Sequence, residues 1–210
     1  MLDSNTTVYV DENGSDTGDG SLSNPFKTIQ KAVDNCPSIT NGYSYSINLA
    51  PGNYSSFKIS NKYINIYTDP TKATPVINGA SAVTRDAILQ MDGHIKFSSD
   101  AVSALTISYN STLFTNYDIT VTSTNLVNNW DPCISVVNNS EFMTGMSSVV
   151  SVYSNKTGIL ANIAGRVYIG KVQGTCSYTG TWIARGSDVR IQTNTLSYNK
   201  EHNNCTYYVN

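Results

Sequence analysis

The side chains of this sequence that could do chemistry are mainly carboxylates, and most of them lie far apart along the chain. A glycoside hydrolase needs two carboxyl groups roughly 5–10 Å apart, one to donate a proton and one to act as base or nucleophile. Asp86 and Asp92, or Asp118 and Asp131, would form such a pair only if folding brought them together. Their spacing selects neither pair, so no catalytic residue is predicted.

Three further aspartates lie closer together, near the N-terminus. Asp11, Asp16 and Asp19 fall within residues 11–24, a turn-rich segment without an apolar run. Ca²⁺ is bound by several converging carboxylate and carbonyl oxygens, so this loop is a candidate Ca²⁺ site. The alternative is that the three side chains accept hydrogen bonds from nearby backbone amides in Asx turns and local caps. No other metal or cofactor is predicted.

The histidines and cysteines form no recognisable motif. His94 lies on an expected strand, and His202 lies in a polar tail. The four cysteines are far apart in the chain: Cys36, Cys133, Cys176 and Cys205. Their spacing does not match a zinc site. Scattered cysteines are most often small buried hydrophobes, although a disulfide between two of them stays open.

The overall composition excludes some classes of partner. The 210 residues carry a formal net charge of −2, and only 13% of them are charged. So weak a field does not attract nucleic acid or an anionic membrane. No run of about 20 apolar residues is present to span a bilayer, and the N-terminus lacks the basic and apolar regions of a signal peptide.

Aromatic side chains are the candidate contact residues. Nine of the 14 tyrosines and both tryptophans are expected to point largely outward or to lie in turns: Tyr43, Tyr45, Tyr54, Tyr63, Tyr67, Tyr109, Tyr117, Tyr153, Tyr178, Trp130 and Trp182. Such rings stack in ladders along a β-structure, pack against a neighbouring subunit, or stack on the faces of sugars. The candidate glycan or subunit contacts are Tyr109, Tyr117, Trp130 and Trp182.

The elements that must position these residues are mainly short strands. Segments of three to five residues, broken by Gly, Asn, Asp, Ser or Pro, read as strands. One helix is predicted over residues 26–35, with Ser23 or Asn24 as N-cap and Pro25 at its first position. Its apolar stripe consists of Phe26, Ile29, Ala32 and Val33.

The strands repeat with a variable period. Val167 and Ile169 recur 22 residues later as Val189 and Ile191, residues 133–136 match residues 158–161 at an offset of 25, and a weaker match at 29 relates Leu105 to Ile134. This pattern predicts a parallel β-helix whose coils contribute about three strands each, stacked about 4.8 Å apart. The predicted inward positions are Ile134, Val136, Phe142, Ile159, Ala161, Val167, Ile169, Ile183, Val189 and Ile191. The apolar helix would then close the open end of the stack.

The same period predicts two contacts between neighbouring coils. Arg166 and Asp188 differ by 22 residues, so they are expected to form an ion pair on the outer face. Tyr168 and Arg190 have the same separation, and the ring is expected to stack against the guanidinium group.

The N-terminal third carries a resemblance to a known fold. A strand at 8–10, Asn-Gly-Ser-Asp at 13–16, Gly-Asp-Gly at 18–20, PFKTIQKAV at 25–33 and INLAPGNY at 47–54 resemble the start of the pectate-lyase-like right-handed parallel β-helix superfamily, which phage tailspikes, appendages and tail fibres also resemble. The resemblance implies an all-β fold. A cap over residues 1–45 would precede about six coils over 46–198, and residues 199–210 would form a tail or contact arm.

The resemblance also frames the function. Similar lyases use a Ca²⁺ cluster and a base, for which no repeated spacing is present here. The expected function is therefore a structural or receptor-binding, glycan-facing virion component, such as a tail fibre, tailspike or neck or baseplate appendage. It would be a homotrimer that contacts other virion proteins and a host surface glycan. The alternatives are a polysaccharide lyase or glycoside hydrolase acting on a host surface polysaccharide, and an extracellular surface adhesin.

Overall fold

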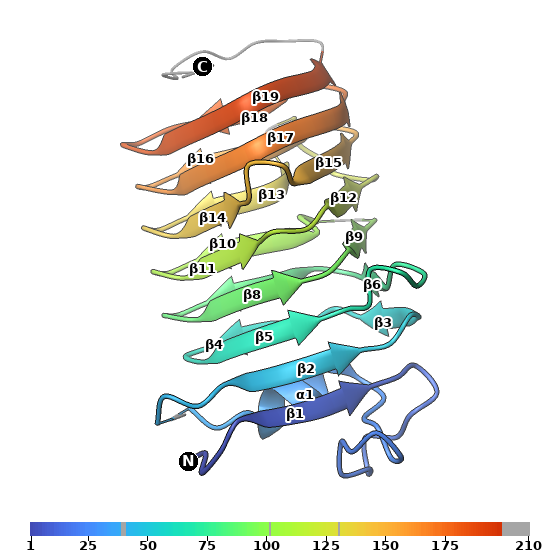
Figure 1. The fold of residues 1–210 in the computed structure, drawn as a ribbon. Coiled ribbons are helices and arrows are strands. Elements are labelled where there is room, and N and C mark those ends of the chain that lie inside the picture. The colour runs from blue at the N-terminus through green and yellow to red at the C-terminus, as the bar shows by residue number, and fades with distance from the viewer. Residues whose placement is uncertain (39–40, 101, 130, 199–210) are drawn as a thin grey trace.

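The chain winds into a parallel β-solenoid of about six turns (Figure 1). The computed structural model describes residues 1–38, 41–100, 102–129 and 131–198. Each full turn places one strand on each of three faces, and every strand pairs in parallel with its equivalent in the next turn. The predicted parallel β-helix is confirmed, with one short helix near the N-terminus.

The three faces, called A, B and C here, follow one another along each turn. Face A consists of β1 (Thr6–Val10), β2 (Tyr45–Leu49), β5 (Tyr63–Tyr67), β8 (Ile88–Asp92), β11 (Thr112–Thr115), β14 (Glu141–Thr144) and the first halves of β17 (Arg166–Cys176) and β19 (Asp188–Tyr198). Face B consists of β3 (Asn53–Ser55), β6 (Val76–Asn78), β9 (Ile95–Ser99), β12 (Ile119–Ser123), β15 (Val149–Ser154) and the second halves of β17 and β19. Face C consists of β4 (Lys58–Ser60), β7 (Ser81–Thr84), β10 (Leu105–Ser108), β13 (Pro132–Val137), β16 (Thr157–Asn162) and β18 (Thr181–Ile183).

The register of the strands matches the repeat seen in the sequence. Val167 pairs with Val189 at an offset of 22, and Ile134 pairs with Ile159 at 25 and with Leu105 at 29. All ten predicted inward residues are buried, so their assignment is confirmed. Because one coil cannot cover its own inward side chains, the stacking of coils creates the hydrophobic core.

The helix α1 (Ile29–Asn35) begins three residues later than predicted. Thr28 is its N-cap, and the hydroxyl of Thr28 accepts a hydrogen bond from the amide of Lys31 at 3.2 Å. The predicted caps Ser23 and Asn24 and the predicted first position of Pro25 are therefore wrong. The backbone of Phe26 is extended instead: its amide donates to Tyr9 and its carbonyl accepts from Asp11, each at 2.9 Å, beside β1.

The apolar stripe lies inside the N-terminal end of the solenoid. Phe26, Ile29, Ala32 and Val33 are all buried, and α1 packs against β1, β2 and β4 (Figure 1). The residues expected to form a C-terminal contact arm, 199–210, lie outside the described residues. Within those residues, no helix is both long enough and apolar enough to cross a membrane.

The corner between faces C and A uses an uncommon backbone. Pairs of residues with positive φ occur there in successive turns, for example Tyr109 and Asn110, both at 57°, and Ile163 at 52° with Ala164 at 57°. Asparagine tolerates this left-handed region better than other non-glycine residues. The side-chain amide of Asn139 also donates to Asn110 Oδ1 at 3.1 Å, so neighbouring corners form a hydrogen-bonded ladder.

Candidate functional site

In each candidate carboxylate pair, the two residues lie at different corners of the solenoid. Asp92 is the last residue of β8, and Asp86 lies two residues before its first residue, so the rise of the strand, about 13 Å, lies between them. Asp118 precedes β12 and Asp131 follows it, after a connecting loop. Asp86 accepts a hydrogen bond from the Asn110 side chain at 3.2 Å, and Asp118 accepts one from the Val149 amide at 2.8 Å. Asp86 and Asp118 thus each accept a hydrogen bond from the next turn of the solenoid.

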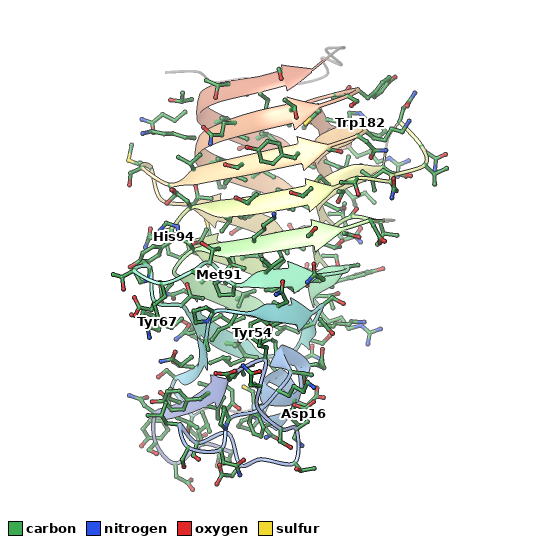
Figure 2. The ribbon with its side chains drawn as sticks, turned by 90° about the vertical axis from the view of Figure 1, so that its right-hand side faces the viewer. Asp16, Tyr54, Tyr67, Met91, His94 and Trp182 are labelled. Carbon is green, nitrogen blue, oxygen red and sulfur yellow. The ribbon has the colours of Figure 1, made fainter. Side chains whose placement is uncertain are left out.

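The clustered aspartates of the N-terminal loop bind backbone groups. Asp16 Oδ1 accepts from the amides of Lys27 and Thr28 at 3.0 and 2.9 Å, and Asp16 Oδ2 accepts from the Thr28 hydroxyl at 2.8 Å. Asp11 forms an Asx turn with the amide of Asn13 at 2.8 Å. In the part of the chain that the structure describes, no three His, Cys, Asp or Glu side chains are arranged to hold a metal ion. Asp16 lies beside the helix at the base of the molecule (Figure 2).

The Asp19 side chain also accepts a hydrogen bond from a nearby backbone amide. Its Oδ1 accepts from the Ser21 amide at 2.9 Å. This backbone hydrogen bond is the main cause that lowers the pKa of Asp19, followed by a hydrogen bond from the Ser21 side chain. The observed hydrogen bonds are therefore those of Asx turns and of a helix cap.

The described cysteines and two of the tyrosines are buried. Cys36, Cys133 and Cys176 are free, and burial raises the pKa of Cys133 and Cys176 to about 12, which makes both thiols poor nucleophiles. Tyr45 and Tyr54 were expected outside, but both rings are buried, and their hydroxyls donate to the carbonyls of Ala32 and Ala50 at 2.9 and 2.8 Å. Cys205 lies outside the described residues.

The predicted aromatic contact residues do not form one surface. Tyr109 lies on the corner between faces C and A with 57% of its surface exposed, whereas Trp182 lies on face C. Tyr117 lies between faces A and B, where its ring makes an edge contact with His94 at 5.7 Å. His94 and Trp182 lie at different heights and on opposite sides in Figure 2. Trp130 lies outside the described residues.

A hollow that the sequence analysis did not predict lies on the corner between faces A and B. Two residues connect β8 to β9, three connect β11 to β12, and four connect β14 to β15. The next two turns have no such connection, because β17 and β19 run unbroken from face A to face B (Figure 1). A projecting turn beneath two smooth strands leaves a step in the surface, which we call the notch.

The four-residue turn is held tightly against β17. Thr144 Oγ1 accepts from the amide of Gly170 at 3.0 Å and donates to the carbonyl of Gly145 at 3.1 Å. A Cβ atom at Gly170 would collide with the carbonyl oxygens of Gly145 and Met146. Glycine at 170 therefore allows the turn to lie directly on the strand.

The notch has a volume of about 500 Å³, within the range of small-molecule sites. Its walls include Tyr168, Arg190 and Gln192 on the strands and Thr144 and Met146 on the turn side. Met146 has 74% of its surface exposed. The notch is thus an open, partly apolar hollow with a few polar groups.

Charges at the notch are paired. The predicted stack is confirmed, because Arg190 lies 5.4 Å from the centre of the Tyr168 ring. Arg190 also forms an ion pair with Asp188 at 3.1 Å, and the Tyr168 hydroxyl donates to Asp188 Oδ2 at 3.3 Å. Burial, and next the charge of Asp188, raise the pKa of Tyr168.

The predicted ion pair between Arg166 and Asp188 is wrong. Arg166 and Asp188 are in register, but Arg166 reaches the previous turn and binds Glu141 at 2.8 Å. Asp188 is held by Arg190 within its own strand. A carboxylate thus lies on each side of Arg166, and the one below binds it.

A column of outward side chains leads into the notch along face A. Phe114 pairs in register with Met143, Met143 with Tyr168, and Tyr168 with Arg190. Phe114, Met143 and Tyr168 are partly buried although they point outward. The column and the notch together form a continuous strip of aromatic, apolar and hydrogen-bonding groups. No single position in the sequence indicates this strip, which depends on the register of four strands.

Comparison with known proteins adds little to this geometry. No protein-family model matches the sequence, and no curated protein is significantly similar to it. Among solved structures, a rhamnogalacturonan lyase aligns with a TM-score of 0.48 and 12% sequence identity, over 93% of this chain and 69% of that chain. At this score the likeness carries no argument about ligand or chemistry.

Proposed function

We propose that the protein is a glycan-binding β-helix whose binding site is the notch together with the column that leads into it. The observation that carries this proposal is the continuous strip from Phe114 to Arg190, which ends in a hollow of about 500 Å³. Saccharides offer apolar ring faces and many hydroxyl groups. An aromatic and apolar strip with amide, hydroxyl and guanidinium groups complements both features.

The wider role that we propose is recognition of a host surface glycan by a rigid rod. The proposed setting is a virion appendage, with a homotrimer and other virion proteins as partners, and an extracellular adhesin is the alternative setting. The virion setting rests on the resemblance of the N-terminal motifs to a fold that phage tailspikes and tail fibres also resemble, and on a weakly charged sequence rich in Asn, Thr and Tyr. Light scattering tests the oligomer, because a trimer has three times the chain mass of 22.8 kDa.

A glycoside hydrolase or lyase is the second candidate function. Glu141 and Asp188 occupy the same outward row two strands apart, at roughly 10 Å, on either side of Arg166. That separation is close to the range used by inverting hydrolases. Both carboxylates are bound by arginine, however, so neither carboxylate is free to face a substrate. This arrangement favours binding over cleavage.

The test is a panel of neutral and acidic polysaccharides, with binding measured by calorimetry. At least one glycan is expected to bind, and Tyr168→Ala and Arg190→Ala are expected to weaken it. Tyr153→Ala is the matched control, because Tyr153 is exposed on face B, away from the notch. Binding that survives both notch variants, or no binding at all, would refute the proposal.

The same panel is assayed for new reducing ends and for the ultraviolet absorbance of unsaturated products. Binding without either signal is the expected result. Rapid cleavage that Glu141→Gln and Asp188→Asn abolish would establish the hydrolase function instead.

A further inference from the structure

The chemistry of the notch narrows the kind of sugar it suits, provided that the notch is the glycan site proposed above. Arg190 is the charged residue among its lining side chains within the described residues, and Asp188 neutralises it at 3.1 Å. A carboxylate-bearing sugar would have to compete with Asp188 for the guanidinium group. The notch is therefore suited to an uncharged substituent.

Two lining residues identify that substituent. The side-chain amide of Gln192 is exposed and makes no hydrogen bond within the described residues, so its two N–H donors and its carbonyl acceptor are available to a ligand. Met146 presents a flexible apolar side chain, most of which is exposed to solvent. A group that contains an amide next to a methyl would use both residues.

We infer that the notch binds an acetamido group, and that the ligand is an N-acetylated amino sugar within a glycan. The carbonyl of the acetamido group accepts one hydrogen bond from the side-chain amide of Gln192. Its methyl group packs against Met146. The sugar ring then lies toward Tyr168 and the column on face A.

The four-residue turn makes this arrangement specific. Thr144, hydrogen bonded to Gly170, fixes the base of the turn, so Met146 projects from a backbone held against β17. A hydroxyl in place of the acetamido group loses the methyl contact and one hydrogen bond. An ammonium group loses the methyl contact and the hydrogen bond as well, and it places a second cation beside Arg190.

The test compares three trisaccharides that differ only at this substituent: chitotriose with acetamido groups, cellotriose with hydroxyls, and the glucosamine trimer with ammonium groups. Calorimetry on the whole chain is expected to show chitotriose binding about tenfold more tightly than cellotriose, from one methyl contact and one hydrogen bond. The glucosamine trimer is expected to bind most weakly. Equal affinity for chitotriose and cellotriose would overturn the inference.

Variants assign the preference to the two residues. Gln192→Ala and Met146→Ala are expected each to reduce the preference for chitotriose. Gln173→Ala is expected to leave it unchanged, because Gln173 is exposed on face B. A preference that survives both notch variants also contradicts the inference. If none of the three binds but another glycan binds at the notch, the inference fails and the proposed function stands; if no glycan binds there, the proposed function fails as well.

Discussion

The N-terminal cap and the notch use their polar residues in opposite ways. In the cap, the clustered aspartates look like a chemical site, but Asp16 binds three donors of the chain itself. In the notch, the lining residues are scattered over more than 40 positions, from Thr144 to Gln192, and look unremarkable in the sequence, yet Gln192 keeps its amide available. Polar side chains that are clustered in the sequence often bind nearby backbone groups. A surface site in a solenoid is instead assembled from equivalent positions in successive turns.

This contrast has a thermodynamic side. The cap must cover the open end of a hydrophobic core, so its buried residues contribute directly to the free energy of unfolding. The notch lies on the outside of a core that other residues already cover. Substitutions in the cap are therefore expected to change stability more than function, and those of the exposed notch residues Met146 and Gln192 to change function more than stability.

The largest effect is expected for Ile29→Asp. Ile29 is fully buried, and the substitution removes its apolar contacts and places a carboxylate in the core. We expect a loss of about 4 kcal/mol or more in the free energy of unfolding, with aggregation through the exposed end. Thermal unfolding and size-exclusion chromatography measure both. Asn35→Asp, at an exposed position of the same helix, is the control, and a soluble, fully stable Ile29→Asp protein would contradict the role of α1 as a cap.

A smaller loss is expected for Asp16→Ala. The change leaves the amides of Lys27 and Thr28 without their acceptor and loosens the start of α1. We expect a decrease of about 1–2 kcal/mol in the free energy of unfolding, measured by urea denaturation. Asp19→Ala removes a hydrogen bond to one backbone amide, that of Ser21, so a smaller decrease in the free energy of unfolding is expected.

Calcium separates the two interpretations of the cap loop. If the aspartates serve as caps, millimolar Ca²⁺ leaves the melting temperature of the protein unchanged. A rise in melting temperature that Asp16→Ala abolishes would instead show that the loop binds Ca²⁺.

Much of the fold could be predicted, because a solenoid repeats its hydrophobic pattern. The offsets of 22, 25 and 29 residues identified equivalent strands before their pairing was known. The start of α1 was less predictable: Pro25 satisfies the rules for a first helical residue, but the extended backbone of Phe26 is set by its pairing with Tyr9 and Asp11 across the chain. The sequence rules for helix starts consider only neighbouring residues, so they cannot predict this pairing with β1.

The notch was not predictable for a related reason. It arises from the difference between a four-residue turn and the unbroken strands above it, and the boundaries of short strands are the least certain part of a sequence-based assignment. The one available signal was the length of residues 166–176, which continue without a turn residue other than glycine. To recognise this segment as one strand that crosses from face A to face B, the position of the corner must already be known.

An intermediate effect, which links stability to binding, is expected for Gly170→Ala. The new methyl group would collide with the carbonyls of Gly145 and Met146, so the turn must move away from β17. We expect a loss of about 1–2 kcal/mol in the free energy of unfolding, with weaker glycan binding because Met146 is displaced. Gly42→Ala is the matched control: it meets no neighbouring atom within 4 Å and carries only the strain of φ at 81°. Normal binding by Gly170→Ala would show that the turn does not shape the site.

The smallest effect, and the one of opposite sign, is expected for Ile163→Asn. Ile163 is exposed and has a φ of 52°, a conformation that a β-branched residue adopts only with strain. Asn138, at the equivalent corner one turn earlier, has a φ of 57°, so asparagine already occupies this conformation in the same ladder. Substitution is expected to increase the free energy of unfolding by about 1 kcal/mol by relieving the strain. Because the corner between faces C and A lies away from the notch, affinity for the glycan is expected to stay the same. Urea denaturation and calorimetry on the same preparation measure both quantities, and a destabilised Ile163→Asn would mean that the exposed isoleucine makes a contact that outweighs its backbone strain.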